Sequence, residues 1–237
     1  CSYNSNSVVS ADTVSWPSGP GLVAETAVMI DASTGSVLFD KKCHQKMYPA
    51  SITKIMTALL TIENCNLDDT VTFSQSAIDT LEPEAANIGA VVGEEMSVKD
   101  CLYALMLQSA NEVASALAEH VSGSIEEFAK LMNKRAKQAG ANDAHFANAC
   151  GLFNKKHYVT AYDMAKIMQA ALRYPVFREI INSSSYTLPT DNKRKEPLTI
   201  SQRHQMVQPW NSFHYDGIIG GTTGFVNESG TTLVTSA

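Results

Sequence analysis

Ser51 and Lys54 stand three residues apart in a stretch whose apolar residues recur with the spacing of a helix. On a helix, this spacing places the hydroxyl and the amine on one face, one turn apart. A lysine amine that is partly removed from water can be neutral and accept the serine proton. The pair therefore predicts a serine nucleophile whose base is a lysine rather than a histidine.

Ser109 and Asn111 form a second polar pair, which interrupts another helix-like apolar stretch. We expect Ser109 to relay a proton between Lys54 and a leaving amine, and Asn111 to hold a substrate amide and orient Lys54. The alternative is that both pairs have purely structural roles and take part in no reaction. In that case the first pair is a capped helix start with an exposed lysine, and the second is a polar kink between helices.

The elements that must position these pairs are helices. Apolar spacing predicts one helix from Ser51 to about Cys65 and a second that opens with the capping pattern Ser97–Asp100. The helical pattern resumes after Asn111 and ends at Gly123. Ser51 would lie in a first turn, where the positive end of the helix dipole favours an alkoxide. Its backbone N–H and one from the last strand could form an oxyanion hole, in which a donor is worth ~3 kcal/mol.

Strand patterns lie at both ends of the chain, with a long helical middle between them. Two short apolar runs around an Asx/Gly turn predict a hairpin, and two further runs flank a turn at Asn227–Gly230. The order predicts the α/β (α+β) class, with an antiparallel sheet built from both chain ends and a helical subdomain inserted. The expected strands are 27–32, 36–40, 217–226 and 231–236, and the later helices are 124–140 and 161–174, the last closed by Pro175.

Composition narrows the partners and the compartment. Residues 1–22 are rich in Ser, Asn, Pro and Gly and are expected to be a flexible lead-in to one domain at 23–237. The formal charge of −6 argues against nucleic acid, and no apolar run approaches the ~20 residues of a membrane span. The five cysteines lack a Cys-x-x-Cys pair, so we expect buried small hydrophobes. Cys1 fits the first residue of a mature lipoprotein, and residues 8–11 fit leftover export-signal sequence equally well.

Three segments carry a resemblance to a known family: Tyr48–Ala58, Ser109–Ala114, and His145–Leu152 with Ala149 where the family has proline. They resemble the motifs of low-molecular-mass penicillin-binding proteins, and more narrowly those of the serine-type D-alanyl-D-alanine carboxypeptidases of peptidase family S11. The resemblance extends from about residue 16 to the end of the chain. It implies a β-lactamase/transpeptidase-like fold and a structural role for His145.

The resemblance also implies an activity. Ser51 would be acylated by a peptidoglycan stem peptide ending in D-Ala-D-Ala, release the terminal D-Ala, and be freed by water. β-Lactam antibiotics would acylate the same serine. No cofactor or metal is implied, the expected location is extracytoplasmic in the bacterial cell envelope, and the oligomeric state stays open. The implied catalytic residues are Ser51, Lys54 and Ser109, and the implied substrate-binding residues are Asn111, Thr222, Thr223 and Gly224.

The third family motif, Lys-Thr-Gly on a strand beside the nucleophile, is altered here. In the stretch Gly220–Val226, Thr222 stands where the lysine belongs and Val226 where a hydroxyl residue is usual. The lysine would place positive charge near the substrate carboxylate and help to keep Lys54 neutral. A charge-assisted hydrogen bond is worth ~1.5–3 kcal/mol, about twice a neutral one. A loss of a few kcal/mol slows the reaction roughly a hundredfold or more. We therefore expect a much weakened carboxypeptidase or a non-hydrolytic relative.

The chain ends at Ala237, soon after the strand that follows the third motif. The family usually continues with one more strand, which sits between the N-terminal hairpin and the strands near Thr222, and with a closing helix. We expect the fold to lack both. The hairpin would then have no neighbour, and a sheet edge would be open.

Other functions remain possible. A class A β-lactamase shares the first two motifs but needs a Glu-x-x-x-Asn loop after the second one, whereas Glu82-Pro83-Glu84 precedes it. An inactive module that binds peptidoglycan stems or β-lactams is favoured by Thr222. A zinc site formed by His145, Cys150 and His157 fits no usual ligand spacing. The Lys193–Lys195 run is expected to be a solvated loop rather than a nucleic-acid patch.

Overall fold

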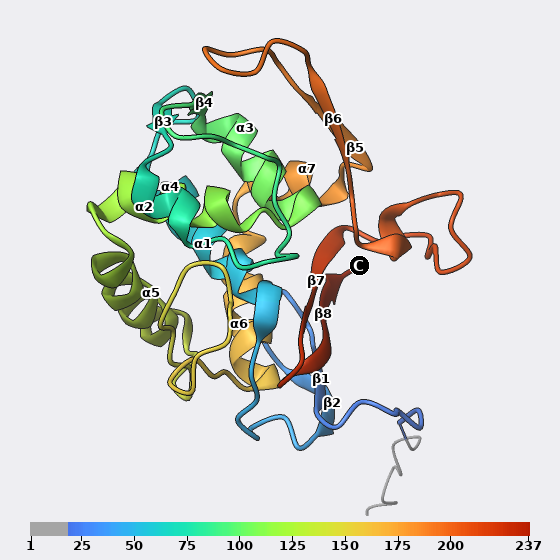
Figure 1. Cartoon of the computed structure of the whole chain (residues 1–237). Helices are drawn as coiled ribbons and strands as arrows, with labels where there is room; N and C mark the ends of the chain where they lie inside the picture. Colours follow the sequence, from blue (N-terminus) through green and yellow to red (C-terminus); the bar gives the residue numbers. More distant parts are fainter. Residues whose placement is uncertain (1–18) are drawn as a thin grey trace, which may run out of the picture.

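The computed structural model describes residues 19–237, so most of the predicted lead-in and the interpretations of Cys1 fall outside it (Figure 1). Helix α1 (Lys54–Asn64) lies at the centre of the molecule and is buried from Lys54 to Thr61. Its neighbours are α4 (Asn111–Ser122), α5 (Ile125–Ala139) and α6 (Ala161–Ala171). Apolar side chains on the facing sides of these helices form the core. Because α1 is packed on several sides, a lysine in its first turn is removed from water.

The surrounding helices begin and end where local chemistry dictates. The side chains of Ser97, Ser124 and Thr160 each accept a hydrogen bond from a backbone N–H in the first turn of the helix that follows. Helices α4 and α5 end at Gly123 and Gly140, which adopt the left-handed conformation that glycine allows. The remaining helical segments are η1 (Ala50–Thr53), α2 (Gln75–Asp79), α3 (Val98–Tyr103), the π-helical turn η2 (Ala104–Gln108), α7 (Pro175–Asn182) and η3 (Gln205–Val207).

The strands pair locally. Within residues 19–237 they form four antiparallel two-stranded sheets, and no hydrogen-bonded ladder joins one pair to another. The pairs are β1 (Ala27–Ile30) with β2 (Val37–Lys41), β3 (Thr70–Thr72) with β4 (Glu95–Ser97), β5 (Ser185–Leu188) with β6 (Leu198–Ser201), and β7 (Gly220–Val226) with β8 (Gly230–Ser236).

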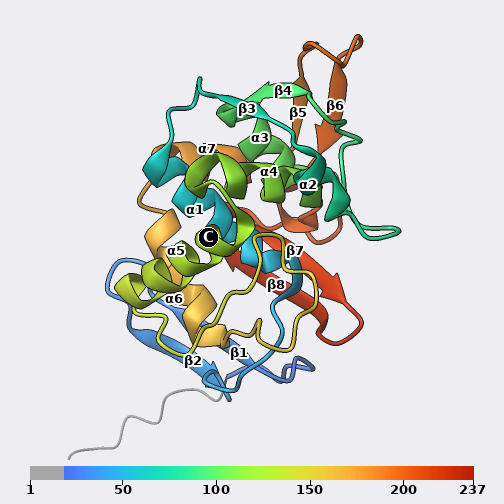
Figure 2. The ribbon, with the colours of Figure 1, turned by 60° about the vertical axis from the view of Figure 1, so that its left-hand side comes forward.

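The predicted helical insertion between two strand-forming chain ends is confirmed, but the single sheet is not observed. The hairpins β1–β2 and β7–β8 both contact α6, yet each keeps its hydrogen bonds to itself (Figures 1 and 2). Two helix boundaries also differ from the prediction. The segment after Ala50 begins as a 3₁₀ turn before α1, and α6 ends at Ala171 because Pro175 starts α7 rather than closing α6.

The basic run Lys193–Lys195 is only partly the solvated loop that was expected. Arg194, in the long β5–β6 connection, is mostly buried and forms an ion pair with Glu94 at 3.0 Å. Asn192 adds a hydrogen bond from its side chain to the carbonyl of Gly93. The tip of this hairpin is therefore docked on the segment that precedes β4, and the prediction was wrong for Arg194. Of the described cysteines, Cys43, Cys101 and Cys150 are buried as predicted, whereas Cys65 is half-buried.

Candidate active site

The hydroxyl of Ser51 and the amine of Lys54 meet at the junction of η1 and α1. The Nζ–Oγ distance is 3.1 Å, which is hydrogen-bond distance. Lys54 Nζ also donates to Oδ1 of Asn111 at 2.6 Å and to the carbonyl of Cys150 at 2.8 Å. These partners come from η1, α4 and the loop before α6. The predicted pair and the predicted Asn111 are thus brought together around one nitrogen.

Burial changes the acidity of this amine. Lys54 is 1% exposed, and desolvation lowers its pKa from 10.5 to about 8. Electrostatic interactions with Cys150 and with the carboxylate of Glu112 oppose the shift, whereas the positive charge of Arg203 adds to it. A lysine with a pKa of about 8 is neutral in about a tenth of the molecules at pH 7, far more than an exposed lysine. It can therefore act as the base for Ser51.

The second motif is held in an unusual backbone conformation. The π-helical turn η2 ends at Ser109, whose φ of 60° and ψ of 34° lie in the left-handed region. This bend separates α3 from α4 and lets α4 begin at Asn111, whose N–H donates to the carbonyl of Ala86 at 2.8 Å. The hydroxyl of Ser109 is buried and has no hydrogen-bond partner in the described part of the chain. Ser109 therefore has donor and acceptor capacity that the protein itself does not use.

Strand β7 runs directly against the nucleophile. A Cβ built on Gly224 would lie 2.6 Å from the backbone N of Ser51, so only glycine permits this approach. Thr223 and Gly224 line the same pocket as Ser51. Thr222, one position earlier on the strand, is not among the lining residues and is 5% exposed. From β8, Thr232 donates to the carbonyl of Pro49 at 2.9 Å and fixes the hairpin to η1.

A second close approach supports the other side of the nucleophile. Ala50 has a φ of 52°, which is rare for a residue with a Cβ. Gly151, with a φ of +91°, packs so tightly that a Cβ there would lie 1.9 Å from the carbonyl O of Ala50. The His145–Leu152 segment therefore serves the site through its backbone. It supplies this glycine and the Cys150 carbonyl that binds Lys54.

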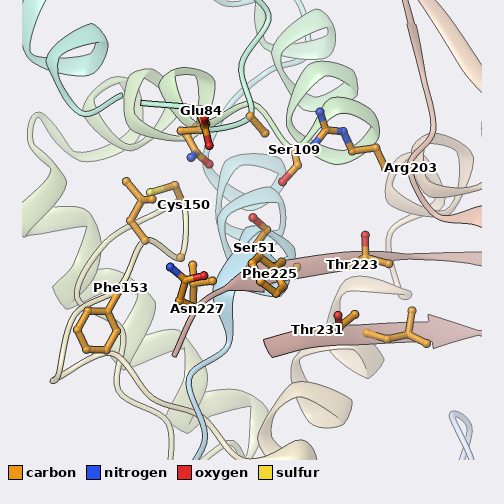
Figure 3. A pocket seen from close by; sticks show the side chains of 18 of the residues that line it. Ser51, Glu84, Ser109, Cys150, Phe153, Arg203, Thr223, Phe225, Asn227 and Thr231 are labelled. Atoms are coloured by element: carbon orange, nitrogen blue, oxygen red, sulfur yellow. The ribbon is translucent and has the colours of Figure 1, made fainter. Parts of the chain in front are cut away.

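These residues open onto a pocket of about 1080 Å³ (Figure 3). Figure 3 shows the side chains of Ser51, Ser109 and Arg203 directed into it, with Glu84 and Phe153 on its other sides. Arg203 stands just before η3, and its N–H donates to the carbonyl of Leu107 at 3.3 Å. Sequence reasoning missed Arg203, because nothing in its local pattern marks it. The sequence also did not predict that Glu84 and Phe153 line the pocket.

The histidines lie outside this machinery. His145 pairs with Tyr158 through an isolated antiparallel bridge, consistent with the structural role that was expected. Nε2 of His157 is hydrogen-bonded to Thr53 Oγ1 at 3.0 Å, and burial lowers the pKa of His157 to about 4. Nδ1 of the same ring accepts from the N–H of Ala147. Both ring nitrogens of His157 are thus engaged, and His145, Cys150 and His157 do not converge on a point where one ion could be shared.

Comparisons with known proteins agree with this geometry. A family model described as peptidase S11, D-alanyl-D-alanine carboxypeptidase, matches residues 13–237. The D-alanyl-D-alanine carboxypeptidase DacF of Bacillus subtilis is 35% identical over 218 residues, which are 90% of this chain and 54% of the relative. The carboxypeptidase DacB2 of Mycobacterium tuberculosis is 32% identical over 229 residues, 96% of this chain and 74% of the relative. The chain therefore spans about half the length of the Bacillus relative.

Solved structures confirm the fold class. The crystal structure of a DD-transpeptidase from Streptomyces superimposes with a TM-score of 0.85 at 27% identity, covering 93% of this chain and 87% of that one. A D-alanyl-D-alanine carboxypeptidase structure from Mycobacterium tuberculosis gives 0.82 at 29% identity, covering 96% and 81%. With the family match extending to the last residue and the Ser51–Lys54 pair in place, the chain belongs to the peptidase S11 family of D-alanyl-D-alanine carboxypeptidases.

Proposed function

We propose that this protein is a serine D,D-carboxypeptidase that removes the terminal D-Ala from peptidoglycan stem peptides through an acyl-enzyme on Ser51. The observation that carries the proposal is the 3.1 Å contact between Ser51 Oγ and a buried Lys54 whose pKa is lowered to about 8. A hydroxyl is a weak nucleophile until a neighbouring base takes its proton. Lys54 is the one base within hydrogen-bond distance of Ser51 in the part of the chain described here.

The reaction follows from the positions of these groups. Neutral Lys54 takes the Ser51 proton while Oγ attacks the carbonyl of the penultimate D-Ala. The C–N bond then breaks, and the proton passes through Ser109 to the departing amine of D-Ala. Water attacks the acyl-enzyme, again with Lys54 as the base, and releases the shortened peptide. The unpartnered Ser109 hydroxyl supports its place in this proton path.

Recognition of the substrate's terminal carboxylate is the next requirement. We assign it to Arg203 and Thr223, which line the pocket together with Ser51. A guanidinium can bind a carboxylate through two parallel hydrogen bonds, and the threonine hydroxyl can add a third. Arg203 thereby supplies part of the positive charge that the third motif loses at Thr222. Asn111 retains its predicted role, with Oδ1 on Lys54 and the amide N–H₂ available to a substrate carbonyl.

The activity is expected to be weakened rather than absent. Thr222 is neutral and is not among the residues that line the pocket, and no described group bonds to the Ser109 hydroxyl. Without a cation next to Ser109, the proton path to the leaving amine has less electrostatic help. Arg203 does lower the pKa of Lys54, so one of the two functions of the missing lysine is partly retained.

The decisive experiment is mass spectrometry after exposure to penicillin. We expect a mass increase of one drug molecule, located on Ser51, and slow loss of the label as water deacylates the enzyme. Ser51→Ala should remain unlabelled, and Ser229→Ala, a hydroxyl in the β7–β8 turn, serves as the matched control that keeps labelling. If the parent protein takes up no drug, the inactive binding module becomes the better explanation. In that case release of D-Ala from a D-Ala-D-Ala peptide should also be undetectable.

The proposed partners are peptidoglycan stems and β-lactams, and the proposed location is the cell envelope, where S11 carboxypeptidases act in general. Among residues 19–237, no helix combines the length and the apolar composition that crossing a membrane requires. The stem peptides of the assembled cell wall lie outside the cytoplasm. The proposed substrate therefore places this domain on that side of the membrane.

A further inference from the structure

Three side chains of metal-binding type meet at the end of the molecule opposite the nucleophile along α1. Cys65 follows the last residue of α1, Asp69 ends the turn that leads into β3, and His120 lies in the last turn of α4. Their potential ligand atoms all lie within 4.8 Å of one another. No other group of three or more His, Cys, Asp or Glu side chains in the described residues comes this close.

The donor set is selective. A thiolate, an imidazole nitrogen and a carboxylate oxygen together suit Zn²⁺, whereas Ca²⁺ and Mg²⁺ prefer oxygen ligands alone. Zinc bonds of about 2.0–2.3 Å in a tetrahedron leave the ligands roughly 3.3–3.8 Å apart. The cluster must therefore tighten by at most about 1.5 Å, which an exposed imidazole at a helix end can supply. Three protein ligands leave the fourth position to water.

The side chains of Cys65, Asp69 and His120 are free to bind a metal ion. The side chains of Cys65 and His120 take part in no hydrogen bond or ion pair that involves residues 19–237. The carboxylate of Asp69 accepts two hydrogen bonds from Asn66, one from the backbone N–H at 2.8 Å and one from the side-chain amide at 3.4 Å. The carbonyl of Asp69 is bound in turn by the N–H of Val98 at 2.9 Å. The carboxylate is thus held in place by neighbours while lone pairs on its oxygens remain, which is the usual arrangement around a metal ligand.

We propose that Cys65, Asp69 and His120 form a binding site for a Zn²⁺ ion, with water as the fourth ligand. The site would join the ends of α1 and α4. The other ends of the same two helices carry Lys54 and Asn111, which are bonded at 2.6 Å. The ion would therefore brace the pair of helices that sets the geometry of the catalytic lysine. It would lie far from the reacting atoms and take no part in the chemistry.

Titration with Co²⁺ tests the proposal on the reduced, chelator-treated protein. Cobalt bound by a thiolate gives a charge-transfer absorption band in the near ultraviolet, and excess Zn²⁺ should abolish it by displacement. We expect one equivalent of Co²⁺ per chain. The band should disappear in Cys65→Ser, and His120→Gln should weaken binding at least tenfold. His44→Gln, an exposed histidine whose nearest charged partner is Asp143 at 4.0 Å, is the matched control and should bind as the parent does.

A second measurement separates the site from the catalytic centre. Zn²⁺ at 100 times the parent's dissociation constant should lower the unfolding equilibrium constant of the parent about 100-fold and that of His120→Gln by no more than about tenfold. Acylation of Ser51 by penicillin should remain in every variant, so failure of the metal site and failure of the proposed function give different results. The proposal is overturned if the parent shows no thiolate band at micromolar Co²⁺, or if Cys65→Ser keeps the band.

Discussion

Lys54 must be neutral to activate Ser51, so the rate of acylation should depend on its protonation. With a pKa of about 8 in the folded protein, the neutral fraction rises about tenfold per pH unit below 8 and levels off above it. We expect the second-order rate constant for acylation by a labelled penicillin to follow this curve between about pH 6 and 10. Arg203→Gln should move the midpoint upward, because the guanidinium disfavours the charged lysine. A profile that is flat in this range would contradict the role of Lys54.

Thr222 offers a direct test of the weakened third motif. Thr222→Lys places an amine where the family has one, and we expect that amine to reach the unpartnered hydroxyl of Ser109. The gain in release of D-Ala should be about tenfold, since a charge-assisted hydrogen bond exceeds a neutral one by roughly 1.5 kcal/mol. Arg203 already supplies part of the charge, so we do not expect the full hundredfold.

The matched control is Thr222→Met, which has similar length without charge and should stay at or below the parent rate. Equal rates for Thr222→Lys and Thr222→Met would show that the missing cation is not what weakens the enzyme. The two variants also report on packing, because position 222 is 5% exposed and both side chains are larger than threonine. Thermal unfolding of both separates a loss of fold from a loss of charge.

At the scale of elements, the contact between β7 and η1 decides how well the oxyanion and the nucleophile are aligned. Gly224→Ala would place a Cβ 2.6 Å from Ser51 N and 2.6 Å from Thr232 Oγ1, so the strand must move away. Such overpacking costs about 1–3 kcal/mol of stability. A displacement of about 1 Å at the nucleophile costs roughly a hundredfold in rate. Penicillin acylation kinetics should show this loss, while Gly21→Ala, which has open space around it, should change nothing.

Elements whose stability is local could be predicted from the sequence, and those set by tertiary contacts could not. Apolar spacing, polar caps and terminal glycines predict the helices α4, α5 and α6. Each helix lies within a few residues of its predicted range. Pro175 was ambiguous, because proline both follows one helix and opens the next. The β5–β6 hairpin has no strong alternation, and distant contacts hold it to the rest of the molecule, among them the ion pair of Arg194 with Glu94.

The same division holds within the site. Ser51 and Lys54 could be predicted as a pair because their spacing puts a hydroxyl and an amine one helical turn apart, and the structure has them in contact. Ser109 and Asn111 were predicted from a polar break in a helical pattern, and Asn111 does contact Lys54. Arg203 was not found, because an arginine in a connecting segment gains its role only from the pocket it enters. The 3₁₀ turn at η1 and the left-handed Ser109 were also beyond prediction. The start of η1 packs closely against Gly151 and against Gly224 of β7, which lie far away in the sequence.

For the whole molecule, the site exists only when distant segments are assembled. The three hydrogen-bond partners of Lys54 come from η1, α4 and the loop before α6, and β7 from the end of the chain closes the arrangement. No single segment could bury the Lys54 amine deeply enough to lower its pKa in this way. Acylation of Ser51 is therefore a sensitive reporter of the global fold, and conditions that loosen the core should abolish labelling.

His157 gives this dependence a definite pH range. Its ring is buried and neutral, donates from Nε2 to Thr53, the neighbour of Lys54, and has its pKa lowered from 6.5 to about 4 by burial and by the nearby His145. Between pH 6.5 and pH 4, His157 is protonated in the unfolded chain but stays neutral in the folded protein. Stability should therefore be full above about pH 6.5 and fall by about 3 kcal/mol as the pH drops to 4. Urea unfolding across this range should show the loss. His157→Gln, although less stable at neutral pH, should show a much shallower slope, and an unchanged slope would assign acid sensitivity to other groups.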